Sequence, residues 1–545
     1  MFQFSTTSAL VILFCFYGIT FLLTLRIGQR QENADGYMVS DGAIGYSMSA
    51  ASMTATWIWA GSFYAAASSG YQYGVSGAIH YGLWGALMIL FIYPFGRRFR
   101  KLAPNAHTLA EIMHARHGSS SQMMLAGSNI VGSIISLMVN FTAAGALVDI
   151  LSPLTFTQGV MIAGAGVLSY TFWSGFRSSV FTDFGQLTAM VVAAVIIIPV
   201  IFYKLGGPEL FEVGMVNLTA EQSSFYSPTA ILEQGAPFFV AVLSYAIGNQ
   251  TIAQRLFAVR EDLIKPSFVT ATIGYGSIVI GLGMLGFLAL LAGIDPIDGD
   301  MNNLIPQMAA TYLSPAMVVL LFVMVIGSLS STADSDLSAL SSIIMTDVYG
   351  KQISKNRPDP IIMVWVGRMT MVTATALGVI FASLKLDILS MLIFVGALWG
   401  AIVFPVIASL YWDRVTNLAF TGSAAVAFLL FLVARFEWLP MVGAVALIFE
   451  VIATIGAAVV IGLMTYGFFG RRAGIILGAI VGCVLVFYSI GFLRDYTVLL
   501  SSLTAYGASA IVCTALSLLS KQPRFDFATI DQRVIEFHSD QHATE

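Results

Sequence analysis

The stretch SMSAASMTATWIWAGSFYAAASSGYQY, residues Ser47 to Tyr73, is long enough to cross a bilayer but is crowded with small and hydroxyl side chains. A hydrocarbon core about 30 Å thick needs roughly 20 apolar residues per helix. Polar and Gly-rich sequence within such a span favours a helix that breaks in mid-membrane, where the freed carbonyls must line a cavity or bind something. The alternative is that the small residues let neighbouring helices pack closely.

The composition of the whole chain is that of a membrane protein. Of its 545 residues, 57% are hydrophobic and only 10% are charged, whereas a soluble protein carries roughly a quarter charged residues. A formal charge of -4 without any basic tract gives no footprint for nucleic-acid binding. Cys15, Cys483 and Cys513 all lie in apolar runs, which is more typical of packing than of a disulfide or a metal site.

About 15 apolar runs have the length of a membrane span. The Lys and Arg residues fall mainly in alternate loops, with Arg255 to Lys265 counted as one of these loops. The positive-inside rule then predicts a cell-membrane protein with its amino terminus outside and its carboxyl terminus in the cytoplasm. The tail after Lys521 is short and polar, and we expect it to be partly ordered at best.

A second polar segment within an apolar run is FVMVIGSLSSTADSDLSALSSIIMTDVY, Phe322 to Tyr349. Ser328, Ser331 and Thr332 stand at i, i+3 and i+4, so their oxygens share one helical face. Hydroxyl and carbonyl oxygens are ligands that a hard cation such as sodium accepts. The segment also carries Asp334 and Asp336, each costing about 2.5 to 3.5 kcal/mol in mid-membrane unless it meets water, an ion or a partner.

A third segment, SYAIGNQTIAQRLF from Ser244 to Phe257, is interrupted by Gly248, Asn249 and Gln250. It lies about 190 residues after the first interruption, and breaks at corresponding places in two halves are typical of carriers with inverted repeats. Asp183 is a further isolated acid, in SSVFTDFGQ near the end of an apolar run. It either snorkels to the cytoplasmic surface or holds a cation.

Five motifs, in this chain GRRFRKLAPNAHTLAEIMHARHG, TWIWAGSFYAAASSGYQYGVSG, SSVFTDFGQ, GNQTIAQR and SSTADSDLSALSSIIMTDVYGK, together resemble the sodium:solute symporter family. The resemblance runs from about Gly36 to Trp412. It implies an all-α polytopic membrane protein of the leucine-transporter type, with 5+5 inverted repeats, one leading helix and about four trailing helices. The expected divisions are a leading helix and linker (1–43), a transport core (44–412), trailing helices (413–520) and a cytoplasmic tail (521–545).

The resemblance also implies two cation sites. The sodium site would comprise the carbonyls of Ala55, Ile58 and Ser328 and the hydroxyls of Ser331 and Thr332. The matching positions of a second cation site are Asp183, Ser331, Asp334 and Ser335. Asp334 stands where the family usually has a hydroxyl, so it either strengthens cation binding or takes up a proton, and the number of sodium ions stays open.

The solute is less clearly indicated. YQYGVSGAIHYG and KLAPNAHT are similar to the urea and polyamine branch, whereas GNQTIAQR resembles the sugar and proline branches. Aromatic walls with a few polar groups suit a small polar molecule. The candidate solute contacts are Trp57, Trp59, Ser62, Tyr81, Trp84, Tyr245, Asn249 and Trp399.

We therefore expect sodium-coupled symport of a small polar organic solute by alternating access, with a urea-like solute as the first candidate. Two alternatives are a membrane sensor or receptor subunit and a proton-coupled carrier of an amino acid, sugar or carboxylate. An enzyme is not expected, because the sequence has no paired histidine ligands, no nucleophile elbow and no phosphate-binding glycine loop.

Overall fold

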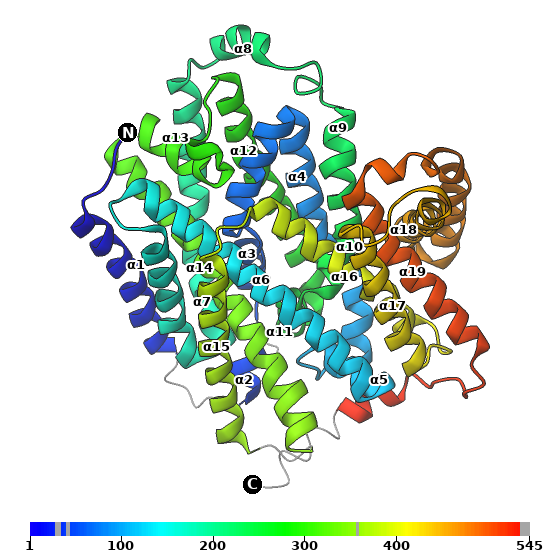
Figure 1. The fold of residues 1–545 in the computed structure, drawn as a ribbon. Coiled ribbons are helices and arrows are strands. Elements are labelled where there is room, and N and C mark those ends of the chain that lie inside the picture. Colours follow the sequence, from blue (N-terminus) through cyan, green and yellow to red (C-terminus); the bar gives the residue numbers. More distant parts are fainter. Residues whose placement is uncertain (28–33, 40–43, 356–358, 535–545) are drawn as a thin grey trace.

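Helices form nearly all the ordered structure of the computed structural model, which describes residues 1–27, 34–39, 44–355 and 359–534 (Figure 1). Within these residues the only extended pairing is an isolated bridge between Ile44 and Val259. Parts of the expected linker before residue 44 and of the tail after residue 534 lie outside the described residues. The expectation of an all-α protein is confirmed.

The described chain has both long and short α-helices, and 12 of its helices are long and apolar enough to cross a membrane. The helices are α1 (Thr6–Ile27), α2 (Ala34–Val39), α3 (Tyr46–Trp57), α4 (Ala60–Leu102), α5 (Leu109–His117), α6 (Ser119–Leu151), α7 (Phe156–Lys204), α8 (Glu209–Gly214), α9 (Pro228–Ala230), α10 (Ala236–Gly248), α11 (Gln250–Ala258), α12 (Ile264–Leu291), α13 (Leu304–Tyr312), α14 (Pro315–Ile343), α15 (Pro360–Ala382), α16 (Ile388–Tyr411), α17 (Asn417–Arg435), α18 (Gly443–Ser489) and α19 (Thr497–Leu519). A π-helical turn, Ile344–Ile353, extends α14.

Three of these long helices contain a glycine at which the chain folds back. Gly74 in α4, Gly175 in α7 and Gly470 in α18 have φ values of 69°, 52° and 84°, a left-handed conformation that glycine adopts without strain. In α18, Gly474 packs against Gly462, so the two halves run antiparallel.

The halves of α4 and α7 also lie side by side. The hydroxyl of Tyr81 donates to the carbonyl of Gly61 at 3.3 Å, although a straight helix would separate the two residues by about 30 Å. Tyr170 and Ser179, on either side of the turn in α7, both donate to Asp334. Two of the 12 apolar helices reverse, at Gly74 and Gly470, and the half of α7 before Gly175 is one further helix, which together give the 15 crossings that the sequence predicts.

Two crossings are broken in the middle, as the polar segments predicted. Helix α3 ends at Trp57, Ile58 has φ −82° and ψ 69°, and α4 begins at Ala60. Helices α10 and α11 are separated by Asn249, whose side chain caps α11 by accepting a hydrogen bond from the Thr251 amide at 2.8 Å. The broken-helix interpretation of the first stretch is therefore confirmed.

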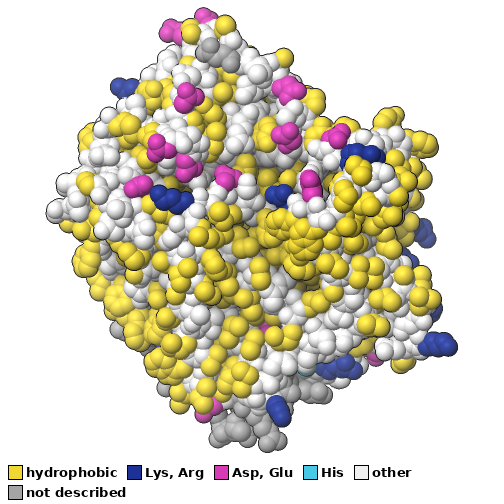
Figure 2. Space-filling view, in the orientation of Figure 1, with side chains coloured by type: hydrophobic (Ala, Val, Ile, Leu, Met, Phe, Trp, Pro, Cys, Tyr) yellow, Lys and Arg dark blue, Asp and Glu magenta, His cyan; other side chains and the backbone are white. Residues whose placement is uncertain are grey.

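The broken helices lie in the middle of the molecule, beside α7 and α14 (Figure 1). Helix α4 packs closely along α12: a Cβ atom at Gly286 would lie 1.8 Å from the carbonyl oxygen of Ala67. Helices α17, α18 and α19 form one flank and α1 the opposite one. Figure 2 shows a broad apolar surface over the middle of the molecule, with acidic side chains gathered above it, as a bilayer-embedded protein requires.

The start of the carboxyl-terminal tail is packed against the protein. The ring of Phe525 lies 4.0 Å from the guanidinium carbon of Arg116 on α5, and Arg533 donates to the carbonyl of Ala115 at 3.0 Å. Ile530 and Val534 are fully buried. Aromatic and apolar side chains within the polar tail therefore anchor residues 521–534, and the rest of the tail lies outside the described residues.

Candidate functional site

The broken end of α3 meets a row of hydroxyl groups on α14. Carbonyls in the last turn of a helix have no helical N–H partner, and here side chains take that role. Ser328 donates to the carbonyl of Ile58 at 2.5 Å, and Thr332 donates to the carbonyl of Thr56 at 2.6 Å. Ile58 and Ser328 are completely buried and Thr332 nearly so. These contacts join two helices through oxygen atoms deep in the protein.

This arrangement differs in detail from the predicted sodium-site ligands. Ala55 is buried in the same turn of α3, but the carbonyl that contacts Thr332 is that of Thr56. Ser328 meets the break through its hydroxyl, whereas its carbonyl was the predicted ligand. Ser331 donates instead to Asp183 Oδ1 at 2.5 Å. The oxygens of the α3 break are still of the type that a small hard cation prefers.

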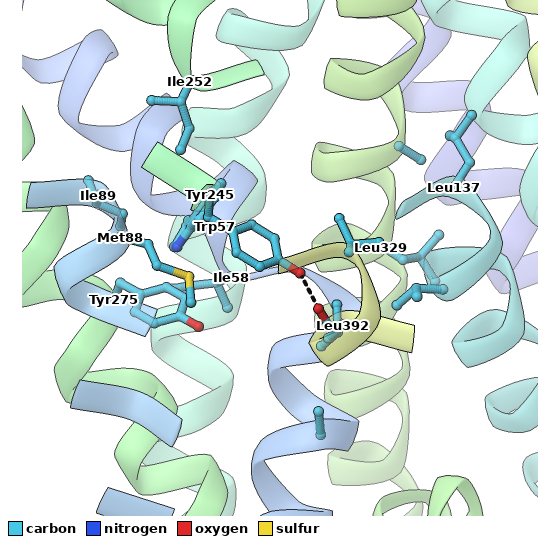
Figure 3. Packing of buried hydrophobic residues seen from close by; sticks show 14 of the residues in the cluster. Trp57, Ile58, Met88, Ile89, Leu137, Tyr245, Ile252, Tyr275, Leu329 and Leu392 are labelled. Carbon is cyan, nitrogen blue, oxygen red and sulfur yellow. Dashed lines mark hydrogen bonds between the residues drawn. The ribbon is translucent and has the colours of Figure 1, made fainter. Parts of the chain in front are cut away.

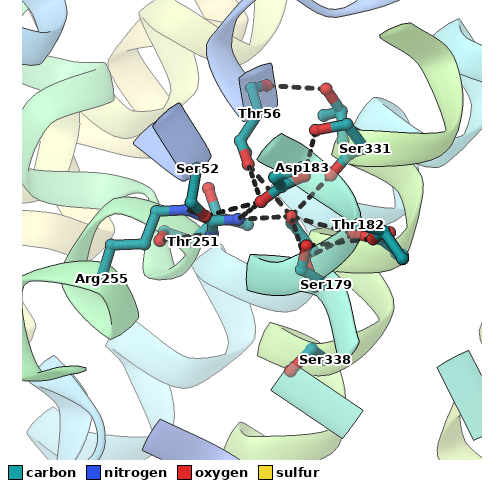
Figure 4. Close-up of polar contacts among 12 residues, drawn as sticks. Ser52, Thr56, Ser179, Thr182, Asp183, Thr251, Arg255, Ser331 and Ser338 are labelled. Atoms are coloured by element: carbon teal, nitrogen blue, oxygen red, sulfur yellow. Dashed lines mark hydrogen bonds and ion pairs between the residues drawn. The ribbon is translucent and has the colours of Figure 1, made fainter. Parts of the chain in front are cut away.

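Asp183 of α7 is the centre of a neighbouring polar cluster (Figure 4). Its carboxylate is completely buried. Oδ2 accepts hydrogen bonds from Ser52 at 2.6 Å and from Arg255 Nη2 at 3.0 Å, the latter as an ion pair. Of the two interpretations of this acid, snorkelling is wrong, because the carboxylate faces the protein interior and pairs with a cation from the chain itself.

Arg255 is a member of the site that the sequence interpretation missed. It was counted as a loop residue that reports topology, but it lies on α11 and is only 3% exposed. Its guanidinium also donates to Ser52 at 3.0 Å, to Ser335 at 2.7 Å and to the carbonyl of Thr251 at 3.3 Å. A charged residue six positions after the break at Asn249 was the signal that could have identified it.

Asp334 completes the cluster on the side of α7. Its oxygens accept hydrogen bonds from Ser179 at 2.6 Å, Tyr170 at 2.7 Å and Ser335 at 3.2 Å. The structure thus brings together all four residues predicted for a second cation, Asp183, Ser331, Asp334 and Ser335. Ser179 and Tyr170 were not among the predicted site residues.

A small enclosed cavity of about 20 Å³ lies between the broken helices, α6, α14 and α16, a volume sufficient for about one water molecule. Five of the eight predicted solute contacts line it. The lining consists of Thr56, Trp57, Trp59, Gly132, Ile135, Ser136, Tyr245, Asn249, Thr251, Thr332, Asp336, Leu392, Val395 and Trp399. Thr56 and Thr332 belong both to this wall and to the contact between α3 and α14.

Three aromatic side chains of the cavity are fixed by hydrogen bonds to backbone carbonyls. The indole of Trp57 donates to Gly85 at 3.0 Å, the hydroxyl of Tyr245 to Leu392 at 2.8 Å and the indole of Trp399 to Ser128 at 3.2 Å. The Tyr245 ring stands edge-on to both tryptophans, with centroid separations of 6.0 and 5.0 Å. Figure 3 shows Trp57 and Tyr245 beside the broken end of α3.

The other three predicted solute contacts do not line the cavity. Ser62 donates to a carbonyl at the α3 break at 3.1 Å, and Tyr81 donates to Gly61 at 3.3 Å. Trp84 donates to His80 Nδ1 at 3.0 Å. Ser62 and Tyr81 support the break from the α4 side, and Trp84 stacks on the His80 ring.

Parts of this chain are similar in sequence to known proteins. The model of the "Sodium:solute symporter family" matches residues 37–425. A "Probable urea active transporter 1" of Schizosaccharomyces pombe is 21% identical over 429 residues, covering 73% of this chain and 64% of that protein, so the alignment spans less than two thirds of the yeast protein. A "Sodium/pantothenate symporter" of Haemophilus influenzae is 25% identical over 373 residues, covering 65% of this chain and 76% of that protein.

Two solved structures share the fold. A Na+-coupled sialic acid symporter in an outward-open state aligns with a TM-score of 0.67 and 17% identity, covering 87% of this chain and 97% of that chain. The nucleobase-cation-symport-1 family transporter Mhp1, in a closed conformation, aligns with a TM-score of 0.51 and 15% identity, covering 92% and 98%. The leucine-transporter-type fold is therefore confirmed, and, because the family model spans most of the chain, this protein belongs to the sodium:solute symporter family.

Proposed function

We propose that this protein couples the inward movement of sodium to the uptake of a small polar organic solute by alternating access. The observation that carries the proposal is the contact between α14 and the broken end of α3, where Ser328 and Thr332 meet backbone carbonyls at 2.5 and 2.6 Å. A sodium ion inserted there would be held by oxygens of both helices. Its arrival and departure would therefore alter how the two helices pack.

The ion and solute positions share residues. Thr56 and Thr332 form part of the α3–α14 contact and also line the central cavity. A ligand in the cavity and an ion at the break would thus each affect the other's surroundings, and the coupling of their affinities must be reciprocal. The five ligands that we assign to sodium are the carbonyls of Ala55, Ile58 and Ser328 and the hydroxyls of Ser331 and Thr332.

Arg255 limits what the second cation position can do in this conformation. Its guanidinium is paired with Asp183 and donates to Ser335. A second sodium at Asp183, Ser331, Asp334 and Ser335 would have to displace this internal cation or follow its movement. We therefore propose one sodium at the α3 break in the conformation described here, with Asp334 as the candidate for a further proton or cation.

The direction of transport follows from the proposed orientation, with the amino terminus outside and the carboxyl terminus in the cytoplasm of a cell-membrane protein. A membrane potential supplies about 2.3 kcal/mol per elementary charge per 100 mV. A low cytoplasmic sodium concentration would then release the ion inside. We assign the transport machinery to residues 44–412 and place the trailing helices of 413–520 at its periphery.

The first solute candidate is a urea-like molecule. It is supported by the relatives in which urea is the printed solute, including the Schizosaccharomyces pombe protein. Pantothenate and proline also occur among the solutes of relatives, so the test must cover several classes.

The test is uptake of labelled urea, putrescine, proline, glucose and acetate into proteoliposomes that contain the purified protein. We expect an inward sodium gradient to drive accumulation of at least one solute above its equilibrium level, and a matched potassium gradient to leave it at equilibrium. Parallel lithium and proton gradients distinguish sodium coupling from a proton-coupled carrier. Uptake that ignores sodium, lithium and pH gradients would contradict the proposed function.

A further inference from the structure

Asp336 is a buried acid that the ion cluster does not use. It lies on α14, is 1% exposed and lines the central cavity. Ser133 and Ser136 of α6 hydrogen-bond its carboxylate, but the Oδ2 atom has no hydrogen-bond partner. Among the described residues that line the cavity, this oxygen is the only buried polar atom left without one. The cavity therefore presents one unmet acceptor on a carboxylate.

Four side chains of the cavity wall already donate hydrogen bonds within the protein. Trp57, Tyr245 and Trp399 donate their polar hydrogens to backbone carbonyls. The Thr332 hydroxyl donates to the carbonyl of Thr56. The aromatic rings of Trp57, Tyr245 and Trp399 thus form largely apolar walls around Asp336 Oδ2, a single acceptor without a donor. A ligand has to bring that donor.

The nearby guanidinium does not satisfy Asp336. The hydrogen bonds of Arg255 go to Asp183, Ser335, Ser52 and the carbonyl of Thr251. The internal cation of the protein is therefore committed to the neighbouring cluster. An ionised carboxylate that is buried without a full set of partners is unfavourable, and the penalty is relieved when a positively charged donor arrives.

We propose that the solute of this carrier is a small organic cation whose ammonium or guanidinium group donates to Asp336 Oδ2 between Trp57, Tyr245 and Trp399. This inference rests on the proposed transport function and replaces its urea-like first candidate with a cationic solute. Tryptophan and tyrosine rings attract a cation that lies against their faces. A neutral urea-like solute supplies N–H donors, but it brings no charge to the carboxylate.

Guanidinium and urea form a matched pair of probes, because both are small and planar and they differ in charge. N-methylguanidinium and N-methylurea provide a second pair. Labelled forms of all four are offered to proteoliposomes under an inward sodium gradient at a fixed membrane potential. We expect the wild-type protein to prefer the cation of each pair by about tenfold or more, since a cation–π contact and a charge-assisted hydrogen bond distinguish the two.

Three variants sharpen the experiment. Asp336→Asn should lower cation uptake by about tenfold and reduce or reverse the preference within each pair, because the charge is gone while the shape is kept. Asp336→Glu keeps the charge and should retain a preference for cations. Asp298→Asn is the control: this acid is exposed in an outer turn with φ 55°, a conformation that asparagine tolerates, so the wild-type preference should remain.

Folding of Asp336→Asn is checked by thermal melting of the purified protein with and without each probe. If the variant does not fold, the melting curve of the wild-type protein decides: guanidinium and N-methylguanidinium at millimolar concentration should protect it, and their urea counterparts should not.

The proposal is overturned if the wild-type protein takes up urea in preference to guanidinium, or neither member of either pair, or if Asp336→Asn keeps the cation preference. It is also overturned if Asp336→Asn changes only the sodium or proton dependence of uptake, since Asp336 would then serve the coupling ion. A cation preference that persists without any stimulation by sodium would instead contradict the proposed function and leave this inference standing.

Discussion

Two buried acidic regions lie close together in this protein, and they differ in how their charge is matched. In the cluster of Asp183 and Asp334, the side chains of Arg255, Ser52, Ser179, Ser331, Ser335 and Tyr170 supply an ion pair and a set of hydrogen bonds. In the central cavity, Asp336 keeps one oxygen without a partner. The protein satisfies the first region itself and leaves the second to a ligand.

We infer from this difference that the first region supports the fold and the second binds a ligand. A buried ion pair adds little net stability, but loss of one partner is costly because the other charge remains. The matched cluster thus holds α3, α7, α11 and α14 in register. The unmatched carboxylate is tolerated because a cavity adjoins it. Substitutions that remove a buried charge or its partner test this comparison.

Removal of the internal cation should have the largest effect. Arg255→Met leaves Asp183 buried without its ion-pair partner, and we expect a loss of about 3 to 5 kcal/mol in stability together with loss of transport. Thermal melting in detergent and sodium-driven uptake measure the two effects. The double variant Asp183→Asn/Arg255→Met should regain much of the melting temperature, since both members of the ion pair are gone and neither is left unpaired. Equal instability of the single and double variants would show that the pair is not what holds the helices.

Removal of a hydroxyl at the α3 break should have the next largest effect. Thr332→Ala removes a hydroxyl that we assign to the sodium ion, the one that contacts the Thr56 carbonyl at 2.6 Å in this conformation; loss of a ligand worth about 1 kcal/mol corresponds to roughly a fivefold higher sodium concentration for half-maximal uptake. Ser331→Ala, which removes the other hydroxyl assigned to sodium, should behave in the same way. Thr375→Ala is the control, because its buried hydroxyl donates to a carbonyl within α15. Unchanged sodium dependence in Thr332→Ala and Ser331→Ala would place the ion elsewhere.

Neutralisation of the matched acid on α14 should have a smaller effect. Asp334→Asn keeps an oxygen for Ser179 or Tyr170 but removes the charge. We expect altered pH dependence, or altered dependence on a second ion, with half-maximal sodium shifted less than in Thr332→Ala. Uptake measured as a function of pH and of sodium concentration separates these effects. Wild-type behaviour in both would mean that Asp334 has only a structural role.

A matched pair outside the transport core should have the smallest effect on transport. Glu450 on α18 accepts two hydrogen bonds from the Arg494 side chain at 2.9 and 2.8 Å. Glu450→Gln should lower the melting temperature slightly and leave the sodium dependence and the solute preference unchanged. A clear change in either would extend the coupled machinery into the trailing helices.

The broken helices were predictable because their cause is local. Small, hydroxyl and glycine residues stand within the spans that break at Ile58 and Asn249, and the spacing of Ser328 and Thr332 places both on one helical face. The pattern within a single segment was enough to predict an oxygen-bearing face on α14, whereas its position against the broken helix was implied by the family resemblance.

The partners across helices were not predictable in the same way. Arg255 and Asp183 are 72 residues apart in the chain, and their contact depends on how α11 packs against α7. Trp84 misses the cavity because the turn at Gly74 sets which face of α4 points inward, and a shift of one residue rotates a helical side chain by about 100°. A local sequence pattern reports neither the packing of α11 against α7 nor the face of α4 that points inward.

The most direct test of the central claim is a pair of high-resolution maps of the protein, one in sodium chloride and one in potassium chloride. We expect density for an ion between the carbonyl of Ile58 and the hydroxyls of α14 in sodium chloride only, with the contacts of Ser328 and Thr332 opened to admit it. Contacts that stay closed in sodium, or an ion bound only where Arg255 now lies, would contradict it.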